Sequence, residues 1–396
     1  MVSERAKRVK PSPTLAMDTK AKEMKSQGID VISFGVGEPD FDTPDNIKEA
    51  AIKAIRDGHT KYTPVGGIPQ LKDAITEKLR KDNALSYKKE EIIVSCGAKH
   101  SLYNIAQAIL SPGDEVVIPS PYWVSYPAQV LLNDATPVFV KTREEDGFML
   151  NPDELKEYIT ERTKAIILNY PSNPTGLGYN SSTLEAIADV AVKSNIYIIS
   201  DEIYEKLLYD GTEHISIASL SEEVKACTIL VNGLSKSHAM TGWRIGYAAG
   251  PEGIIKAMTK IQSQSTSNPA SISQWAAVEA LRGPQDFIRT MVEEFDIRRR
   301  FLVEALNNIE GIRCGLPTGA FYVFPNVSEI FGKGYKGRTI EDSSALALYF
   351  LEEAGVALVP GSAFGAEGYI RISYATSMEN IRKAVERIGE AIEKLS

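Results

Sequence analysis

The sequence predicts an α/β protein in which helices sandwich a mostly parallel central sheet. From about Asn46 to Pro251, short β-branched-rich runs alternate with helix-period segments such as Lys99–Leu110 and Ser182–Ser194. The runs are apolar at nearly every position, which is typical of strands buried on both faces of a parallel sheet. Ligands of such sheets bind outside the carboxyl ends of the strands. The expected strands are Glu91–Ser95, Glu115–Pro119, Pro137–Val140, Ala165–Tyr170, Asn195–Ser200 and Thr228–Asn232.

The pattern changes after Pro251 and predicts a second, smaller α+β unit. The first 45 residues add one helix, Thr14–Gln27, and a Gly/Pro segment. We therefore expect a large domain at residues 46–285 and a small domain built from residues 1–45 plus 286–396. The later helices are expected at Glu252–Ser263, Ser271–Leu281, Gln285–Asn308, Ser343–Glu353 and Met378–Leu395, and the short strands at Ala320–Phe324, Val356–Pro360 and Tyr369–Ser373.

Composition narrows the class of protein. The 396 residues are 43 % hydrophobic and 24 % charged, which excludes a disordered chain. The net charge of −8, from 44 basic and 52 acidic residues, disfavours nucleic acid as a partner. The N-terminus lacks an apolar signal region, and no stretch reaches the ~18 apolar residues of a membrane span. Three cysteines without C-x-x-C spacing indicate a reducing compartment, so we expect a cytoplasmic protein with no membrane partner.

The sequence predicts neither a dinucleotide-binding motif nor a metal site. The segment Gly332–Gly337 matches G-x-G-x-x-G, but it has no strand before it and no helix after it, so it predicts a surface turn. The four histidines are scattered without ligand-like spacing, and we expect no metal site.

Two segments that follow predicted strands could serve a ligand. Ser95–Lys99 lies between a strand and a helix, where free backbone N–H groups suit a phosphate, although small residues are common in any such turn. Asn169–Gly176 runs from a strand into two prolines and a glycine, which predicts a rigid loop that holds Asn173 at the sheet edge. An ordinary turn remains the alternative for this loop.

Two further segments carry charged groups. Asp201 ends a very apolar strand, where its carboxylate needs a cation, either a protonated ring nitrogen of a cofactor or an arginine or lysine of the chain. Lys236 follows another buried strand among small and hydroxyl residues, which favours an amine nucleophile of lowered pKa. Arg244 is a natural phosphate ligand. Together these segments offer an amine for an aldehyde, a carboxylate for a pyridinium, hydroxyl and amide groups for a phenolate oxygen, and a cradle for a phosphate. This combination predicts pyridoxal 5′-phosphate as the cofactor.

The segments that carry this chemistry resemble those of class I/II aminotransferases, which are fold type I pyridoxal-phosphate enzymes. Within that family the chain resembles the bacterial and archaeal-type aspartate aminotransferase subgroup. The resemblance covers essentially the whole chain. It rests on Gly35–Phe41, Lys61–Thr63, Pro171–Gly176, Ser200–Tyr204 and Ser235–Gly246, and for the subgroup on Lys10–Ser12, Pro121–Tyr126 and Gln264–Ser267.

The resemblance implies roles around the cofactor ring. Lys236 would bind the cofactor aldehyde covalently and then act as general acid and base. Asp201 would keep the pyridine nitrogen protonated, Tyr204 and Asn173 would bind the phenolate oxygen, and Trp123 would stack on the ring and line the substrate site.

The resemblance also implies which residues hold the anionic groups. The phosphate would be bound by Gly97, Ala98, Ser235 and Arg244, joined by Tyr62 of a neighbouring subunit, which implies a homodimer with shared active sites. Arg371 would bind the substrate α-carboxylate in a bidentate fork, and Gly37 would offer it a backbone contact.

The chain departs from the family pattern at two places. Gly233 stands where the animal and enterobacterial enzymes have a serine that binds the cofactor phosphate. In this chain the place of that serine hydroxyl is taken either by Ser235 or by a backbone group. The arginine that binds the distal carboxylate of the substrate in those enzymes has no match in this chain. In the subgroup that the chain resembles, Lys99 and Ser12 are the candidates for binding an acidic substrate side chain. The alternative for Lys99 is a helix-start lysine in solvent.

The implied activity is a ping-pong aminotransferase that moves the amino group of L-aspartate to 2-oxoglutarate. The alternatives are an aromatic-amino-acid or prephenate aminotransferase, a C–S β-lyase, and a regulator built on an aminotransferase-like domain. A regulator of that kind normally carries a DNA-binding segment ahead of the domain, and only ~30 residues precede Gly35.

Overall fold

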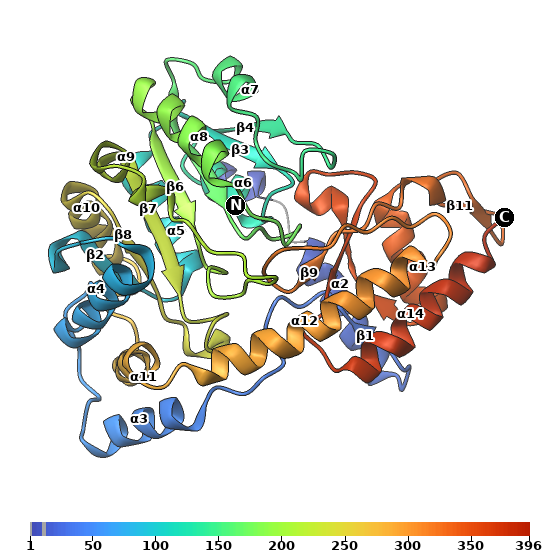
Figure 1. The fold of residues 1–396 in the computed structure, drawn as a ribbon, viewed down its shortest axis with the longest axis horizontal. Coiled ribbons are helices and arrows are strands. Elements are labelled where there is room, and N and C mark those ends of the chain that lie inside the picture. The colour runs from blue at the N-terminus through green and yellow to red at the C-terminus, as the bar shows by residue number, and fades with distance from the viewer. Residues whose placement is uncertain (1, 10–12) are drawn as a thin grey trace.

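The fold is built on a central sheet, seen in a computed structural model that describes residues 2–9 and 13–396 (Figure 1). Within this described part, the sheet has seven strands in the order β2-β8-β7-β6-β5-β3-β4. All neighbours pair in parallel except β8, which is antiparallel to β2 and β7. The predicted mostly parallel sheet is confirmed. The strands are β2 Ile92–Ser95, β3 Glu115–Ser120, β4 Thr136–Lys141, β5 Thr163–Asn169, β6 Tyr197–Asp201, β7 Thr228–Gly233 and β8 Gly246–Ala249.

Helices cover both faces of the sheet because its strands are apolar at consecutive positions. In β6, Ile199 packs under α5, α6 and α10, whereas the preceding Ile198 packs on the opposite face with α7, α8 and α9. On that opposite face, Ile92 and Val94 of β2 pack with α3, α4 and α11. The helices are α3 Asp45–Arg56, α4 Pro69–Asn83, α5 Ala98–Ile109, α6 Ser125–Leu131, α7 Pro152–Glu157, α8 Ser181–Lys193, α9 Glu222–Cys227, α10 Glu252–Ser263 and α11 Ser271–Arg282.

A second group of elements comes from both ends of the chain. Helix α12 (Asp286–Asn307) runs from the central sheet to this group (Figure 1). The parallel pair β1–β12 joins the N-terminal region to the C-terminal third, beside an antiparallel sheet of order β13-β14-β9. The elements are α2 Pro13–Ser26, β1 Ile32–Ser33, β9 Tyr322–Val323, α13 Ser343–Ala354, β12 Val356–Ala357, β13 Val359–Pro360, β14 Ile370–Ser373 and α14 Met378–Glu393. Helix α1 (Glu4–Arg8) lies instead beside the central sheet, where Arg5 and Arg8 pair with Asp134.

The expected strand Val356–Pro360 is wrong as a single strand. Its first two residues pair with β1, and its last two pair with β14. Leu358 between them is fully buried. The apolar run is therefore continuous, but its two halves hydrogen-bond to different sheets.

The glycine-rich segment Gly332–Gly337 forms a hairpin, as the predicted surface turn requires. β10 (Gly334–Tyr335) and β11 (Arg338–Thr339) pair antiparallel across Lys336 and Gly337, both of which have positive φ. No phosphate-binding helix opens from this segment, so the dinucleotide motif is excluded there.

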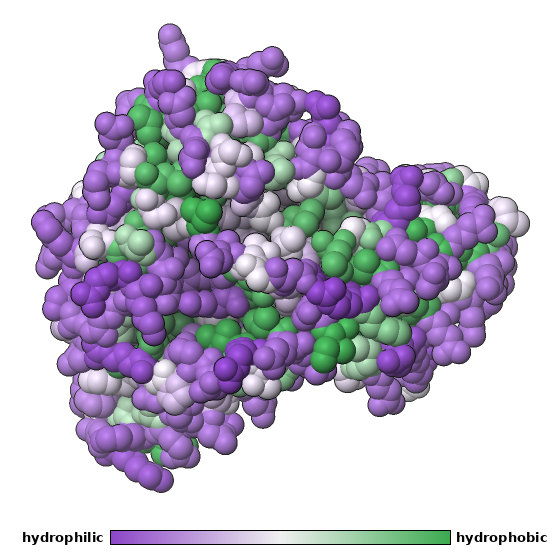
Figure 2. All heavy atoms as spheres, viewed as in Figure 1, coloured by the Kyte–Doolittle hydropathy of each residue, from purple (hydrophilic) through white to green (hydrophobic). Residues whose placement is uncertain are grey.

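The proposed division into a large domain at residues 46–285 and a small domain at residues 1–45 plus 286–396 stays a prediction. One apolar cluster crosses that boundary, because Tyr204 and Leu207 pack with Phe321 and Phe350. Figure 2 shows that hydrophilic residues cover most of one face, with small hydrophobic groups along its middle. Among the described residues, no helix combines the length and the apolar character needed to cross a membrane.

Candidate active site

A cavity of about 380 Å³ opens at the carboxyl ends of the central strands. β6 ends at Asp201, β7 leads into Ser235 and Lys236, and the loop after β5 supplies Asn173. β14 contributes Arg371 from the second group of elements. The sequence-predicted residues that line this cavity are Gly37, Ala98, Lys99, Trp123, Asn173, Asp201, Tyr204, Ser235, Lys236, Arg244 and Arg371.

Two of the sequence-predicted residues that the structure describes do not line the cavity. Gly97 lies directly before α5, where it borders Arg244. Tyr62 is 91 % exposed and lies outside the cavity of its own chain. Ser12 falls outside the described residues.

Lys236 presents its amine inside the cavity. Its Nζ donates a hydrogen bond to the carbonyl oxygen of Gly37 and lies 6.0 Å from the centroid of the Tyr204 ring. Burial lowers the pKa of Lys236 to about 8, and the positive charges of Arg371 and Arg244 act in the same direction. A fraction of this amine is therefore unprotonated near neutral pH, as a nucleophile or proton acceptor requires.

Asp201 is a buried carboxylate without a cationic partner. Its Oδ2 accepts a hydrogen bond of 2.7 Å from Tyr126 Oη, and its Oδ1 accepts a weaker one from the Ile203 backbone N–H. Burial raises the pKa of Asp201 to about 6, although the Tyr126 hydrogen bond opposes this shift. Among the ion pairs of the described residues, none includes Asp201, so its charge is available to a cationic ligand.

Arg371 is buried among neutral groups. Its Nη1 donates to Asn173 Oδ1 (2.8 Å) and its Nη2 to Gly35 O (2.7 Å), while Nε has no partner among the described residues. The guanidinium lies 4.6 Å from the Tyr322 ring centroid. Burial lowers the pKa of Arg371. A buried guanidinium with unused hydrogen-bonding capacity is suited to a ligand carboxylate.

The start of α5 forms a tight cradle beside Arg244. Gly97 has φ +86°, and a Cβ added there would lie 2.5 Å from Arg244 Nη2. A Cβ on Gly246 would collide with the backbone of Ala98. Both glycines therefore allow the start of α5 and the Arg244 guanidinium to approach closely, and the first N–H groups of a helix favour an anion.

Gly233 is explained by the same close packing. It ends β7 opposite Gly246, and a Cβ on Gly233 would lie 3.0 Å from Gly246 Cα and 3.0 Å from Ile245 O. A serine at this position would press on the neighbouring strand. The hydroxyl that lines the cavity nearby is instead that of Ser235.

Lys99 lies over an aromatic ring at the cavity wall. Its Nζ is 4.8 Å from the centroid of the Trp123 ring. Burial lowers the pKa of Lys99, and Arg244 lowers it further. Lys99 is exposed at the start of α5 and also lines the cavity, so the alternative of a helix-start lysine in solvent stays open.

Sequence reasoning missed two tyrosines of the site. Tyr126 binds Asp201, and Tyr322 Oη lies 2.8 Å from Tyr204 Oη. Tyr126 falls in a segment that carried only a family likeness, whereas Tyr322 is one more aromatic residue in a short apolar strand. Neither contact has a signal in local sequence spacing.

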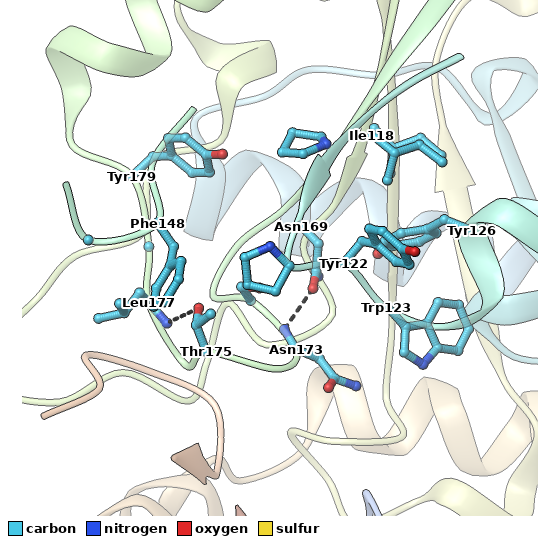
Figure 3. A pocket seen from close by; sticks show the side chains of 16 residues that line it. Ile118, Tyr122, Trp123, Tyr126, Phe148, Asn169, Asn173, Thr175, Leu177 and Tyr179 are labelled. Carbon is cyan, nitrogen blue, oxygen red and sulfur yellow. Dashed lines mark hydrogen bonds between the residues drawn. The ribbon is translucent and has the colours of Figure 1, made fainter. Parts of the chain in front are cut away.

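A second, small cavity of about 30 Å³ lies behind Trp123 (Figure 3). The loop that carries Asn173 borders it, and the Asn173 backbone N–H donates to Asn169 Oδ1 at 2.8 Å. Leu177 N–H donates to Thr175 Oγ1 in the same loop. These bonds fix the loop internally, so that the Asn173 amide reaches the main cavity.

Known proteins are similar to this chain in sequence and in fold. The family model described as aminotransferase class I and II matches residues 29–388. The chain is 55 % identical to the aspartate aminotransferase of Bacillus sp. (strain YM-2), covering 99 % of both chains. It is 52 % identical to a Rickettsia conorii protein named "Probable aspartate/prephenate aminotransferase", over 99 % of this chain and 98 % of that one. The solved structure of the Rhizobium meliloti aspartate aminotransferase superposes with a TM-score of 0.97 at 45 % identity and covers 100 % of both chains.

Proposed function

This chain belongs to the class I and II aminotransferase family, and on that basis we propose that it moves the amino group of L-aspartate to 2-oxoglutarate, giving oxaloacetate and L-glutamate. The observation that carries the proposal is a set of cations in one cavity. Lys99, Lys236, Arg244 and Arg371 all line it, and among the described residues none of these four side chains forms an ion pair. Such a cavity suits a ligand set with one phosphate and two carboxylates.

The enzyme is a pyridoxal-phosphate-dependent aminotransferase, and its residues fit that cofactor. Asp201 offers a buried carboxylate without a cation, as a protonated ring nitrogen needs. Lys236 offers a buried amine of lowered pKa, and Gly97 lets the start of α5 lie directly against Arg244, so that helix N–H groups and a guanidinium suited to a phosphate lie together. When bound, the cofactor supplies an aldehyde that captures amines and a pyridinium ring that accepts the electrons of the substrate Cα–H bond.

We assign the proton chemistry to Lys236 and the groups around it. Its Nζ, with a pKa of about 8, would remove the proton from the substrate Cα as general base and, as general acid, deliver it to the carbon that carried the cofactor aldehyde, which completes the 1,3-proton shift. Asp201 would hold a proton on the cofactor ring nitrogen by charge attraction. Tyr204 Oη and Asn173 Nδ2 would donate to the phenolate oxygen, which is consistent with Asn173 Oδ1 being occupied by Arg371.

Two cations bind the substrate carboxylates in this proposal. Arg371 holds the α-carboxylate, with Gly37 offering a backbone contact in the segment that crosses the cavity. Lys99 binds the side-chain carboxylate from its place over Trp123. Ser12 keeps its proposed part in the same subsite.

The phosphate subsite is completed by a second copy of the chain. We assign the phosphate to the backbone at Gly97 and Ala98, to Ser235 and to Arg244. Tyr62, exposed in its own chain, would reach the partner's phosphate in a homodimer. A cytoplasmic location is proposed alongside, since the three cysteines, Cys96, Cys227 and Cys314, are all free.

A half-reaction panel tests the substrate. The purified enzyme with bound cofactor is offered amino acids one at a time, and the visible cofactor band is followed. Aspartate and glutamate should convert the band fastest, and oxaloacetate should accumulate with aspartate. No conversion with any amino acid would contradict the aminotransferase proposal, and release of pyruvate with a thiol from cystathionine would favour a C–S β-lyase.

Prephenate transamination is the second candidate, and the Rickettsia conorii relative favours it. Prephenate also carries two carboxylates, so Arg371 and Lys99 suit it as well. The same enzyme preparation charged with glutamate should be offered prephenate and oxaloacetate in parallel. A higher kcat/KM for prephenate would replace aspartate as the assigned substrate.

A further inference from the structure

A fully buried carboxylate lies directly behind the site and takes no part in the chemistry described above. Glu202 is 0 % exposed. Its Oε1 accepts hydrogen bonds from Ser200 Oγ (2.8 Å), Ser216 Oγ (2.7 Å) and Tyr170 Oη (3.4 Å). Its Oε2 lies 2.8 Å from His214 Nε2. Burying a carboxylate is costly and is weak evidence for stability by itself, so its role is to be sought in what its partners hold.

The partners of Glu202 connect two strand ends that carry site residues. Tyr170 is the first residue after β5, and its backbone N–H donates to Asp201 O at 3.3 Å. Asn169 Nδ2 donates to the same carbonyl at 3.0 Å, while Asn169 Oδ1 accepts from the Asn173 N–H. Glu202 therefore ties the end of β6 to the loop that positions Asn173.

The surroundings of Glu202 are already satisfied by the protein. Glu202, Glu205 and His214 place ligand atoms within 4.8 Å of one another, a spacing that could suit a metal ion. However, Glu205 is ion-paired with Lys78 and accepts from Asn83 Nδ2 at 2.8 Å. Lys78 supplies a positive charge to the cluster, and the carboxylates of Glu202 and Glu205 each already accept hydrogen bonds from the protein. This arrangement indicates a hydrogen-bond network rather than a metal site.

We propose that Glu202 is a positioning residue: its buried carboxylate fixes Tyr170 and the end of β6, so that Asp201 and Asn173 face one bound ring from two strands. This inference rests on the proposed roles of Asp201 and Asn173. Without the carboxylate, the hydroxyls of Ser200, Ser216 and Tyr170 lose their shared acceptor. Each then turns to another partner, and the two strand ends lose a common anchor.

Binding of pyridoxal phosphate to the apoprotein tests the role without any turnover. Glu202→Ala should raise the dissociation constant about tenfold and shift the pH midpoint of the visible cofactor band, as removal of an outer hydrogen-bond partner does at other buried sites. Glu202→Gln keeps an oxygen acceptor and should stay within about threefold of the unmodified enzyme. This partial rescue separates positioning from loss of charge.

Glu115→Ala is the matched control. Glu115 is a buried carboxylate at the amino end of β3, where it accepts from Thr160 Oγ1 at 2.6 Å and pairs with Arg162. Its removal should lower the unfolding temperature but leave cofactor affinity and the pH midpoint unchanged, because Glu115 lies at the amino ends of the strands and the cavity lies at their carboxyl ends.

The outcomes separate this inference from the proposed function. If Glu202→Ala binds the cofactor like the unmodified enzyme, or if the control shifts the midpoint equally, the positioning role is wrong. If Glu202→Ala does not fold, Ser216→Ala decides, since it removes one donor and should weaken binding two- to threefold; an unchanged affinity overturns the role. Failure of the unmodified enzyme to bind pyridoxal phosphate would instead contradict the proposed function.

Discussion

Two regions of the molecule bury arginines in opposite ways. On α12, Arg299 is 0 % exposed and is paired with Asp210 and Asp296, while its Nη1 donates to a backbone carbonyl. In the cavity, Arg371 is almost as buried but contacts only neutral groups and keeps an unpartnered Nε. A buried cation whose charge is matched within the chain supports the fold, whereas one left unmatched is kept for a ligand.

The largest effect on activity is expected from the amine of the same cavity. Lys236→Ala should lower kcat by about 10⁴-fold or more, because it removes both the covalent attachment point and the proton acceptor. Steady-state assays with aspartate and 2-oxoglutarate measure this. Retention of more than a hundredth of the activity would remove Lys236 from the proton transfer.

The two arginines can be compared directly through matched substitutions. Arg299→Met should reduce the free energy of unfolding by about 1.5–3 kcal/mol, because it removes a fully buried guanidinium and its charge-assisted hydrogen bonds, although Asp210 and Asp296 are partly exposed and still pair with Arg300. Arg371→Met should cost at most about 1 kcal/mol of stability but lower kcat/KM for aspartate about 100-fold. Urea unfolding of the apoproteins and steady-state kinetics separate the two; equal losses of stability would break the contrast.

A smaller effect concerns the unmatched carboxylate. The folded-state pKa of Asp201, about 6, lies above its ordinary value of 3.8, so ionisation opposes folding of the apoprotein above that ordinary value. The destabilisation is absent below pH 4 and grows to about 3 kcal/mol as the pH rises through 6. Asp201→Asn should therefore stabilise the apoprotein at pH 7 but not at pH 4, as measured by urea unfolding at both values. A gain independent of pH would show that the charge of Asp201 is not its source.

The smallest effect is expected at the phosphate cradle. Gly97→Ala places a Cβ against Arg244 in a backbone conformation with positive φ, at a cost of about 1–2 kcal/mol. Cofactor affinity should fall by about tenfold, since the guanidinium must move. Gly113→Ala is the control, because its φ is also positive but nothing lies within 4 Å of the added atom. Equal losses of affinity in both variants would show that backbone strain alone is responsible.

The sequence predicted what local pattern controls. The buried strands were found because each is apolar throughout, and α10 was placed at its observed bounds because its apolar positions repeat with the helical period. β8 was missed because three of its four residues are glycine or alanine and its antiparallel pairing depends on neighbours far along the chain. Helix α4 was missed because most of its residues are polar and only one face is buried.

The site residues also differ in whether local sequence pattern reveals them. Asp201, Lys236 and Asn173 could be singled out because strand ends carry them into one edge of the sheet. The Tyr126 contact to Asp201 and the Tyr322 contact to Tyr204 join elements separated by long stretches of chain, so no spacing rule reveals them. That Lys99 and Arg371 have no ion-pair partner in the described part of the chain also emerges only from the packed structure.

The most direct test of whether Arg371 and Lys99 bind the substrate carboxylates uses one unreactive dicarboxylate and one unreactive monocarboxylate. Succinate and propionate should be titrated against the cofactor-loaded enzyme, Arg371→Met and Lys99→Met, with the cofactor absorbance as the signal. We predict that Arg371→Met weakens both ligands, while Lys99→Met weakens succinate about tenfold and leaves propionate unchanged. Succinate affinity unaltered in Lys99→Met, or propionate affinity unaltered in Arg371→Met, would contradict the claim that these cations are held for the carboxylates of the substrate.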